Sequence, residues 1–506
     1  MKIKFEKSGI DKLNADAYLF LCYEDKNLFD EQIKQIQKIL KTKISELSLE
    51  DFKGKQGQAA LVYSNKYRII LSGLGKRENV TLEKIRIAVS KIIKKAHLLK
   101  IKKVAIEVLN DDSLSFCIRE IANAQGIGSI LGNYYFTKYY TSKDKKDATY
   151  IKEAIFFADK KLTEKHSKEL ERGIKTGGII GNATTFARDL GNEPSNILYP
   201  ETYSNMIEER SKTRKYTAEV LNLEEIKKLK MGGVIEVAKG SNHEPRFLIM
   251  RYQGGAEGEQ PYVIIGKGVT FDSGGISLKP PPGMANMKMD MCGSAAAIAI
   301  VEAVAQLGLK INVVGLVPMV ENMPDGNSLK PGDVITAYNG KTIEIDNTDA
   351  EGRLILADAL SYAAEFNPKA VIDMATLTGA VVIALGNVTS AVMGNDQPLI
   401  DKLFKAGMES YDRVWQLPLW DEYDKFIDSD IADVKNSGTG RQAGTIAAGM
   451  FLKRFIGDYP WAHIDIAATA MRDSMQDFYP KYATGAGVRL VTQYLMNEEE
   501  LNSSNT

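Results

Sequence analysis

Lysine and carboxylate side chains gather in one glycine-rich segment, GKGVTFDSGGISLKPPPGMANMKMD, which spans residues 266–290. Lys267, Asp272 and Lys279 follow an apolar run with the composition of a buried strand, and Asp290 precedes an alanine-rich stretch typical of a helix. In α/β folds, ligands bind beyond the ends of strands. The segment is therefore a candidate site.

A second group of charged residues lies in NTDAEGRL, residues 347–354. Asp349, Glu351 and Arg353 occupy every second position, so in an extended stretch their side chains project from one face.

Three aspartates and one glutamate in a shared cleft repel one another unless they are protonated or neutralised. Divalent cations supply that neutralisation, and oxygen ligands suit Mg²⁺ and Mn²⁺ as well as Zn²⁺. The four histidines lie outside both motifs, so a metal here is held mostly by oxygen. They are His97, His166, His243 and His463.

Aspartates also favour turns and the positions before helices, which offers a purely structural explanation for each carboxylate taken alone. That explanation weakens for the whole set, because two lysines and an arginine share these apolar segments and buried unpaired charge is costly. The residues indicate a metallohydrolase.

These motifs resemble those of the leucyl (cytosol) aminopeptidase family. The similarity lies in GKGVTFDSGGISLKP, MKMDMCGSAAA and NTDAEGRL, and extends to ARDLGNEPSN, ENMPDGNSLKPGDV, DMATLTGA, WAHIDIAATA and ATGAGVRL. It covers about residues 185–495.

The resemblance implies an aminopeptidase that binds two divalent metal ions, Mn²⁺ or Zn²⁺ with Mg²⁺ as a further option. Lys267, Asp272, Asp290 and Glu351 would hold a tightly bound metal, and Asp272, Asp349 and Glu351 a more exchangeable one. A water bridged by the two metals would be the nucleophile. As a ligand Lys267 must be neutral, with a pKa depressed well below the free value of about 10.4.

The resemblance also assigns catalytic roles to Lys279 and Arg353. Lys279 would donate to the oxyanion of the tetrahedral intermediate, and Arg353 would hold a bicarbonate ion. Their structural alternatives are a surface lysine before Pro-Pro-Pro and a salt bridge to neighbouring carboxylates. Substrate-binding positions would be Met287, Asp290, Thr376, Leu377 and Gly379, although Met287 also suits a core.

Apolar runs, such as residues 17–22, 262–265 and 370–375, alternate with amphipathic stretches. This pattern predicts an α/β fold: a small mixed α/β amino-terminal domain, then a larger catalytic domain around a mixed, mostly parallel sheet. The expected boundaries are 1–160 for the first domain, 161–190 for a linking helix broken at Gly177-Gly178, 191–496 for the catalytic domain and 497–506 for a polar, disordered tail. Ala443 and Ala468 stand where the family often has glycine.

A chain of 506 residues with 44% hydrophobic and 26% charged residues is expected to fold into at least two domains. No signal peptide is evident, and the apolar stretch 371–388 is interrupted by polar residues, which favours a buried strand and turn over a membrane span. Three widely spaced cysteines fit a reducing cytoplasm.

Positive charge is concentrated in residues 1–160, which hold 30 Lys and Arg against 20 Asp and Glu. The basic stretch 84–103 raises the alternative of nucleic-acid binding, with a steep salt dependence. Apolar residues at helical spacing, such as Ile85, Val89 and Ile92, instead favour an amphipathic helix whose lysines face solvent.

The sequence thus predicts a cytoplasmic metallo-exopeptidase that releases leucine or another apolar amino-terminal residue from short peptides, and the family resemblance suggests a homohexamer. A hydrolase of different specificity, such as a dipeptide-selective enzyme, is the alternative within the same class.

Overall fold

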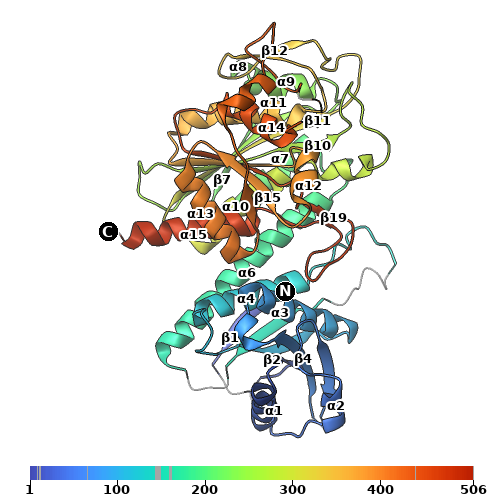
Figure 1. Cartoon of the computed structure of the whole chain (residues 1–506), viewed down its shortest axis with the longest axis vertical. Helices are drawn as coiled ribbons and strands as arrows, with labels where there is room; N and C mark the ends of the chain where they lie inside the picture. The colour runs from blue at the N-terminus through green and yellow to red at the C-terminus, as the bar shows by residue number, and fades with distance from the viewer. Residues whose placement is uncertain are drawn as a thin grey trace. The chain divides into compact units, whose positions relative to one another are not determined.

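The computed structural model describes residues 1–504 apart from residues 8–9, 11–12, 65, 143–149, 159–161, 439 and 441. The chain divides into two compact units (Figure 1). Unit 1 contains residues 1–185 and 474–480, and unit 2 contains residues 186–473 and 481–506. Helix α6, Glu164–Asn192, carries the chain from the first unit into the second.

Unit 1 is built on a six-stranded sheet in the order β1-β6-β5-β2-β4-β3, parallel except for β3 at one edge. Alternate residues of β2 face opposite sides, Leu19 and Leu21 in one apolar cluster and Phe20 in another, so helices pack on both faces. The elements are β1 Lys2–Glu6, β2 Ala17–Tyr23, β3 Ala59–Tyr63, β4 Arg68–Gly75, β5 Lys103–Glu107, β6 Glu153–Phe157, α1 Lys26–Leu40, α2 Glu46–Glu50, η2 Arg77–Asn79, α3 Leu82–Leu98 and α4 Ile118–Gly132.

Helix α3 contains most of the basic stretch, and its apolar side is buried as the spacing predicts, with Ile85, Val89 and Ile92 fully inaccessible. Arg86 belongs to the same basic stretch. It is buried and its guanidinium lies 3.1 Å from the Glu83 carboxylate, because the intervening turn of helix brings i and i+3 together. Part of the positive charge is therefore neutralised within the unit.

Helix α6 runs without interruption through Gly177-Gly178, where the sequence predicts a break. The glycines serve packing instead. A Cβ at Gly177 would lie 3.0 Å from the Ile127 backbone nitrogen and still closer to the Asn123 carbonyl oxygen, both in α4, so the absence of a side chain lets the two helices approach.

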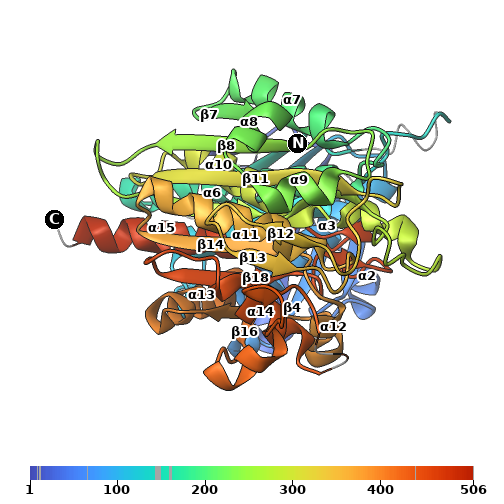
Figure 2. The same cartoon turned by 90° about the horizontal axis from the view of Figure 1, so that it is seen from above.

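Unit 2 is built on a nine-stranded mixed sheet in the order β16-β15-β18-β14-β9-β11-β8-β7, with β10 beside β11 (Figure 2). The central strands β18, β14, β9 and β11 are parallel to one another. Strand β15 runs antiparallel to β18, β8 runs antiparallel to β11, and β7 runs antiparallel to β8. The strands are β7 Thr217–Leu221, β8 Arg246–Gln253, β9 Tyr262–Gly266, β10 Gly268–Asp272, β11 Asn312–Asn322, β14 Ala370–Ala375, β15 Ser390–Gly394, β16 Val414–Gln416 and β18 Trp461–Asp465.

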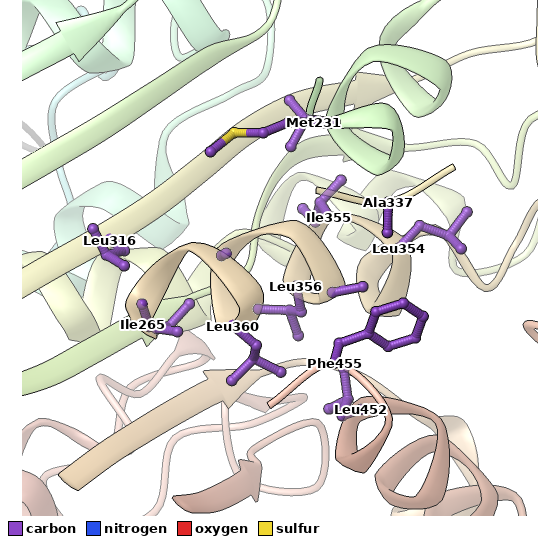
Figure 3. Close-up of a cluster of buried hydrophobic side chains, with 14 of the residues drawn as sticks. Met231, Ile265, Leu316, Ala337, Leu354, Ile355, Leu356, Leu360, Leu452 and Phe455 are labelled. Atoms are coloured by element: carbon purple, nitrogen blue, oxygen red, sulfur yellow. The ribbon is translucent and has the colours of Figure 1, made fainter. Parts of the chain in front are cut away.

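Helices cover this sheet on both faces. One face packs against α9, α11 and α14 through an apolar cluster that joins Ile265 and Leu316 to Leu356 and Leu360 (Figure 3). The alanine-rich α10 contacts β9, β11 and β14 and is paired with α15. The remaining elements of unit 2 are α7 Pro200–Ser211, α8 Leu223–Lys228, α9 Gly232–Ala238, η3 Met284–Met289, α10 Cys292–Leu307, α11 Glu351–Ala363, η4 Ala364–Phe366, α12 Gly379–Leu385, α13 Gln397–Ser410, η5 Asp421–Phe426, α14 Gly444–Lys453, α15 Val488–Ser504, and the short strands β12 Val334–Thr336, β13 Thr342–Glu344, β17 Val434–Lys435, β19 Met471–Arg472 and β20 Tyr482–Ala483.

Among the described residues one helical stretch, Met284–Leu307, is long and apolar enough for a membrane span, and 89% of its most apolar window is buried inside the protein.

Helix α15 extends through Ser504, into the segment for which the sequence predicts disorder. Glu498 explains the order, because its carboxylate accepts a hydrogen bond from the Tyr262 hydroxyl at 3.0 Å and pairs with Lys402 at 2.9 Å.

Ala443, before α14, has a left-handed backbone with φ 48°. A Cβ in this region costs roughly 1–2 kcal/mol, whereas glycine costs about 0.4–1 kcal/mol through the unfolded chain. We therefore expect Ala443→Gly to stabilise unit 2 by about 0.5–1 kcal/mol in urea unfolding. Ala448→Gly, inside α14, should instead destabilise unit 2 by about 1 kcal/mol or more. Equal losses in both variants would contradict the backbone argument.

Candidate active site

Parallel strands bring the predicted site residues to one edge of the unit 2 sheet. Lys267 directly follows β9, Thr376 directly follows β14, and Asp272 is the last residue of β10. Because β9, β14 and β11 are parallel and β10 is parallel to β11, these positions share the carboxyl edge of the sheet. That edge is where the sequence predicts ligand binding.

The Lys267 ammonium lies at the centre of the buried part of the site. Its Nζ is 2.8 Å from Oδ2 of Asp290 and 2.9 Å from Oε1 of Glu351, and it donates to the Thr376 carbonyl oxygen at 3.0 Å. The Thr376 hydroxyl also donates to Asp290, at 2.8 Å. The lysine side chain is only 4% exposed, so these four groups form a closed cluster.

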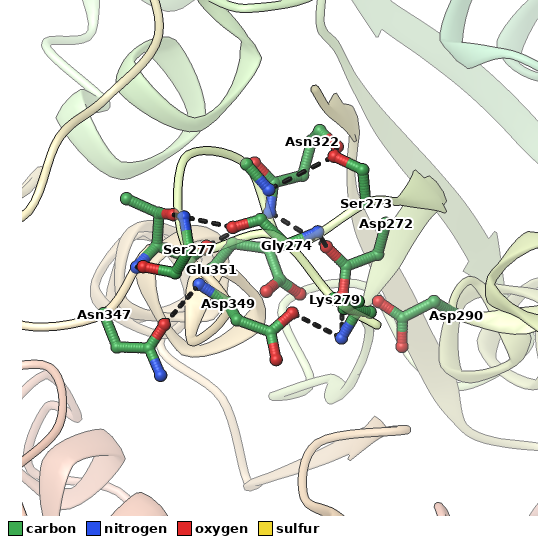
Figure 4. Close-up of polar contacts among 12 residues, drawn as sticks. Asp272, Ser273, Gly274, Ser277, Lys279, Asp290, Asn322, Asn347, Asp349 and Glu351 are labelled. Carbon is green, nitrogen blue, oxygen red and sulfur yellow. Dashed lines mark hydrogen bonds and ion pairs between the residues drawn. The ribbon is translucent and has the colours of Figure 1, made fainter. Parts of the chain in front are cut away.

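A second charged cluster surrounds Lys279 (Figure 4). Its Nζ lies 2.8 Å from Oδ2 of Asp272 and forms an ion pair with Asp349. Oδ1 of Asp272 accepts hydrogen bonds from the Gly274 backbone N–H and from Nδ2 of Asn322, both at 2.9 Å. The Lys279 side chain is 19% exposed, so this cluster reaches the surface of the cavity.

Asp349, Glu351 and Arg353 do not lie on an extended stretch, which corrects the geometry that alternation suggested. Asp349 lies in a turn, and Glu351 is the first residue of α11. The backbone N–H of Asp349 donates to Oδ1 of Asn347 at 2.8 Å, which holds the turn that leads into the helix. The three side chains still converge, because a turn followed by a helix start brings nearby residues to one end.

Burial and mutual repulsion govern the ionisation of these groups. Burial raises the pKa of Glu351 and that of Asp349, and the neighbouring Asp272 carboxylate raises both further. Burial also raises the pKa of Asp290. For Lys267, burial lowers the pKa, but the surrounding carboxylates outweigh burial and raise it overall. The cluster therefore favours positive charge at its centre.

The donor set fits divalent cations. Asp272, Asp290 and Glu351 are buried, and one carboxylate oxygen from each lies within 4.8 Å of the others. Oε2 of Glu351 is buried and makes no hydrogen bond with any described residue. Hard oxygen ligands suit Mg²⁺ and Mn²⁺ and are accepted by Zn²⁺. None of the four histidines belongs to this cluster, and His463 is paired with Asp373 at 2.6 Å.

The charged groups lie beside a cavity of about 490 Å³. Ten of the eleven predicted site residues line it, while Glu351 lies beside Lys267 without lining it. The ten are Lys267, Asp272, Lys279, Met287, Asp290, Asp349, Arg353, Thr376, Leu377 and Gly379. Apolar groups such as Val382, Phe426 and Met471 complete the wall, so the cavity can take a partly apolar molecule.

Three supporting residues were not among the sequence predictions. Asn322 ends β11 and fixes Asp272. Asp465 ends β18 and accepts hydrogen bonds from the Leu377 backbone N–H and the Thr378 hydroxyl. The Asn436 carbonyl oxygen accepts from Arg353 at 2.6 Å. Asn322 and Asp465 lie in ENMPDGNSLKPGDV and WAHIDIAATA, so the family-like motifs were the available signal.

Comparison with known proteins identifies the family and the fold. The model of the cytosol aminopeptidase family catalytic domain matches residues 185–492, and that of its N-terminal domain matches residues 19–143. The chain belongs to the cytosol aminopeptidase family. As a member it is a hydrolase, an aminopeptidase, and its buried acidic cluster is consistent with the use of divalent metal by the family.

Relatives and solved structures agree with this assignment. A probable cytosol aminopeptidase of Alkaliphilus oremlandii (strain OhILAs) is 39% identical over 99% of this chain and 100% of its own length. One of Geobacter sp. (strain M21) is 44% identical over 88% of this chain and 89% of its own. The bottromycin maturation enzyme BotP in complex with Mn has a TM-score of 0.84 at 30% identity, covering 96% of this chain and 100% of that one. A mutant of tomato leucine aminopeptidase has a TM-score of 0.84 at 27% identity, covering 98% and 96%.

Metal binding should stabilise the folded protein, because the carboxylates converge only there. Adding Mn²⁺ to chelator-treated protein at about 100 times its Kd should add about 2.7 kcal/mol of stability, seen as a rise in Tm. Asp290→Asn should reduce the rise. Asp412→Asn removes a buried carboxylate outside the cavity and should retain it in full. An unchanged Tm of the unsubstituted protein at millimolar Mn²⁺ would contradict the metal assignment.

Proposed function

We propose that this aminopeptidase uses two divalent metal ions to release an apolar amino-terminal residue, leucine above all, from short peptides. The observation that carries the proposal is the convergence of four carboxylates and two lysines on one cavity with a partly apolar wall. Such a site pairs a strong field for cations with room for a side chain.

The residues present suit two neighbouring metal sites. Lys267, Asp272, Asp290 and Glu351 would hold one ion, and Asp272, Asp349 and Glu351 the other. Lys267 coordinates only as a neutral amine, so the adjacent dication would have to lower the pKa that the surrounding carboxylates raise. When bound, the ions supply Lewis acidity toward the peptide carbonyl and an activated water at neutral pH. The Mn complex of the structural neighbour BotP supports manganese as one occupant, with zinc and magnesium as alternatives.

Asp290 is the residue proposed to select a free amino terminus. Its carboxylate lines the cavity beside Lys267 and is held by the Thr376 hydroxyl. A carboxylate in this position can accept hydrogen bonds from a substrate ammonium or amine. Met287, Thr376, Leu377 and Gly379 line the same cavity, and a Cβ at Gly379 would meet nothing within 4 Å, so the wall leaves space for the first substrate side chain.

Lys279 and Arg353 are proposed to act on the developing charge. Lys279 is partly exposed to the cavity and stays charged, so it can donate to the oxyanion. Arg353 is buried, and its Nε makes no hydrogen bond with any described residue. This free donor supports binding of a planar anion such as bicarbonate, which would accept from the guanidinium.

We also propose the assembly and location expected of this family, a homohexamer in the cytoplasm. The hexamer is proposed from membership of the family, and the location is supported by the naming of the relatives as cytosol aminopeptidases. Light scattering of the purified protein tests the assembly directly.

The two lysines should differ when replaced. Lys267→Ala removes a group proposed as a metal ligand and should chiefly lower metal content per chain. Lys279→Ala should leave metal content unchanged and lower kcat about 100-fold, equivalent to about 3 kcal/mol of oxyanion stabilisation. Metal analysis beside steady-state kinetics at saturating Mn²⁺ measures both effects. Loss of metal from Lys279→Ala with retention in Lys267→Ala would reverse the proposed roles.

Blocking the substrate amine should abolish cleavage. N-acetylation removes the positive charge and the lone pair that Asp290 and the adjacent metal are proposed to bind, so an acetylated leucyl peptide should be cleaved at least 100-fold more slowly than the free peptide. A competition assay with both peptides in one reaction controls for enzyme integrity. Equal rates on the two peptides would exclude an aminopeptidase mechanism at this site.

A further inference from the structure

Gly352 lies against the functional end of Lys267. It is the second residue of α11, directly after Glu351. A Cβ built at this position would lie 2.5 Å from Cε of Lys267, 2.7 Å from Nζ and 2.8 Å from Cδ. Real side chains do not approach so closely, so either the lysine or the helix must move if any other residue occupies the position.

The Lys267 backbone cannot supply that movement. Its N–H donates to the Met374 carbonyl oxygen at 3.0 Å, and its carbonyl oxygen accepts from the Ser294 N–H at 2.8 Å. The backbone beside Lys267 is also closely packed, because a Cβ at Gly266 or Gly293 would collide with backbone atoms of α10 or β14. Helix α11 is also restrained, because its residues Leu354 and Leu356 are fully buried in the apolar cluster, so the flexible lysine side chain is the group that moves.

Gly352 differs from these neighbouring glycines in the atoms that an added Cβ would meet. At Gly266 and Gly293 the close atoms are backbone, so a larger residue there would disrupt packing of the fold. At Gly352 all three close atoms belong to the outer part of one flexible side chain. A larger residue would therefore spare the fold and displace the amine.

We propose that Gly352 is a positioning residue that keeps the Lys267 amine between Asp290 and Glu351, where it contributes to the proposed metal site. The inference rests on the proposed function. Alanine is favoured over glycine within helices, so the glycine carries a cost in local stability. The space it leaves for Lys267 explains that cost.

The test is Gly352→Ala, compared with the matched control Gly449→Ala. Gly449 is also a buried helical glycine, and its Cβ would lie 2.9 Å from side-chain atoms of Leu419 and Met393, neither of which lines the cavity. Both variants should fold with Tm values close to that of the unsubstituted protein. Titration of Mn²⁺ into chelator-treated protein should show affinity about 10- to 100-fold weaker in Gly352→Ala and unchanged in Gly449→Ala.

A double variant tests whether the loss of Mn²⁺ affinity acts through Lys267. In a Lys267→Ala background the added methyl group meets no lysine, so Gly352→Ala should cause no further loss of affinity. Equal losses in the two backgrounds, or unchanged affinity in the single variant, would overturn the proposal. If Gly352→Ala alone does not fold, recovery of folding in the double variant supports the contact and failure to recover overturns it. Absence of Mn²⁺ binding to the unsubstituted protein would instead overturn the proposed function itself.

Discussion

The confinement of like charges at the carboxyl edge of one sheet is the constraint on which the rest of unit 2 depends. Asp272, Asp290 and Glu351 come from three separate segments, yet their oxygens approach within 4.8 Å in a buried setting. The Asp272 carboxylate adds to burial in raising the pKa of Asp290 and that of Glu351, so these two groups resist ionisation unless cations lie among them. The parallel order of β9, β11 and β14 contributes to the geometry, because Lys267, Asn322 and Thr376 at the ends of these strands share one edge and contact the carboxylates.

Neutral hydrogen-bond donors hold these charges in fixed directions without cancelling them. Asn322 and the Gly274 N–H both donate to one oxygen of Asp272, which leaves the other oxygen directed at Lys279. Asp465 holds the turn after β14 through the Leu377 N–H and the Thr378 hydroxyl. Side chains supported in this way keep their positions as charge in the cavity changes, which is what preorganised electrostatic catalysis requires.

Sequence patterns predicted the elements and the family, but not the local geometry of the site. The apolar runs 17–22, 262–265 and 370–375 are confirmed as β2, β9 and β14, because strands buried on both faces have continuous apolar sequence. The spacing of the charged residues from Asp349 to Arg353 wrongly suggested an extended stretch. Charged side chains in a turn that enters a helix can also occupy every second position over five residues. A helix break was predicted at Gly177-Gly178 because a glycine pair lowers helix propensity. Only the close packing of α4 in the folded structure reveals why glycine is needed there. Asn322 carries no charge, so residue chemistry alone gave no reason to select it.

The two lysines let the acidic cluster exist in a folded chain. A buried carboxylate without a partner is strongly destabilising, whereas one that is paired and hydrogen-bonded is tolerated. Lys267 pairs with Asp290 and Glu351, and Lys279 pairs with Asp272 and Asp349, so each lysine offsets one of the two negative charges in its half of the cluster. Their environments then divide them: the Lys267 side chain is 4% exposed and enclosed, and the Lys279 side chain is 19% exposed and borders the cavity. The same charges that allow the protein to fold therefore leave one amine inside the cluster and place the other where a substrate can reach it.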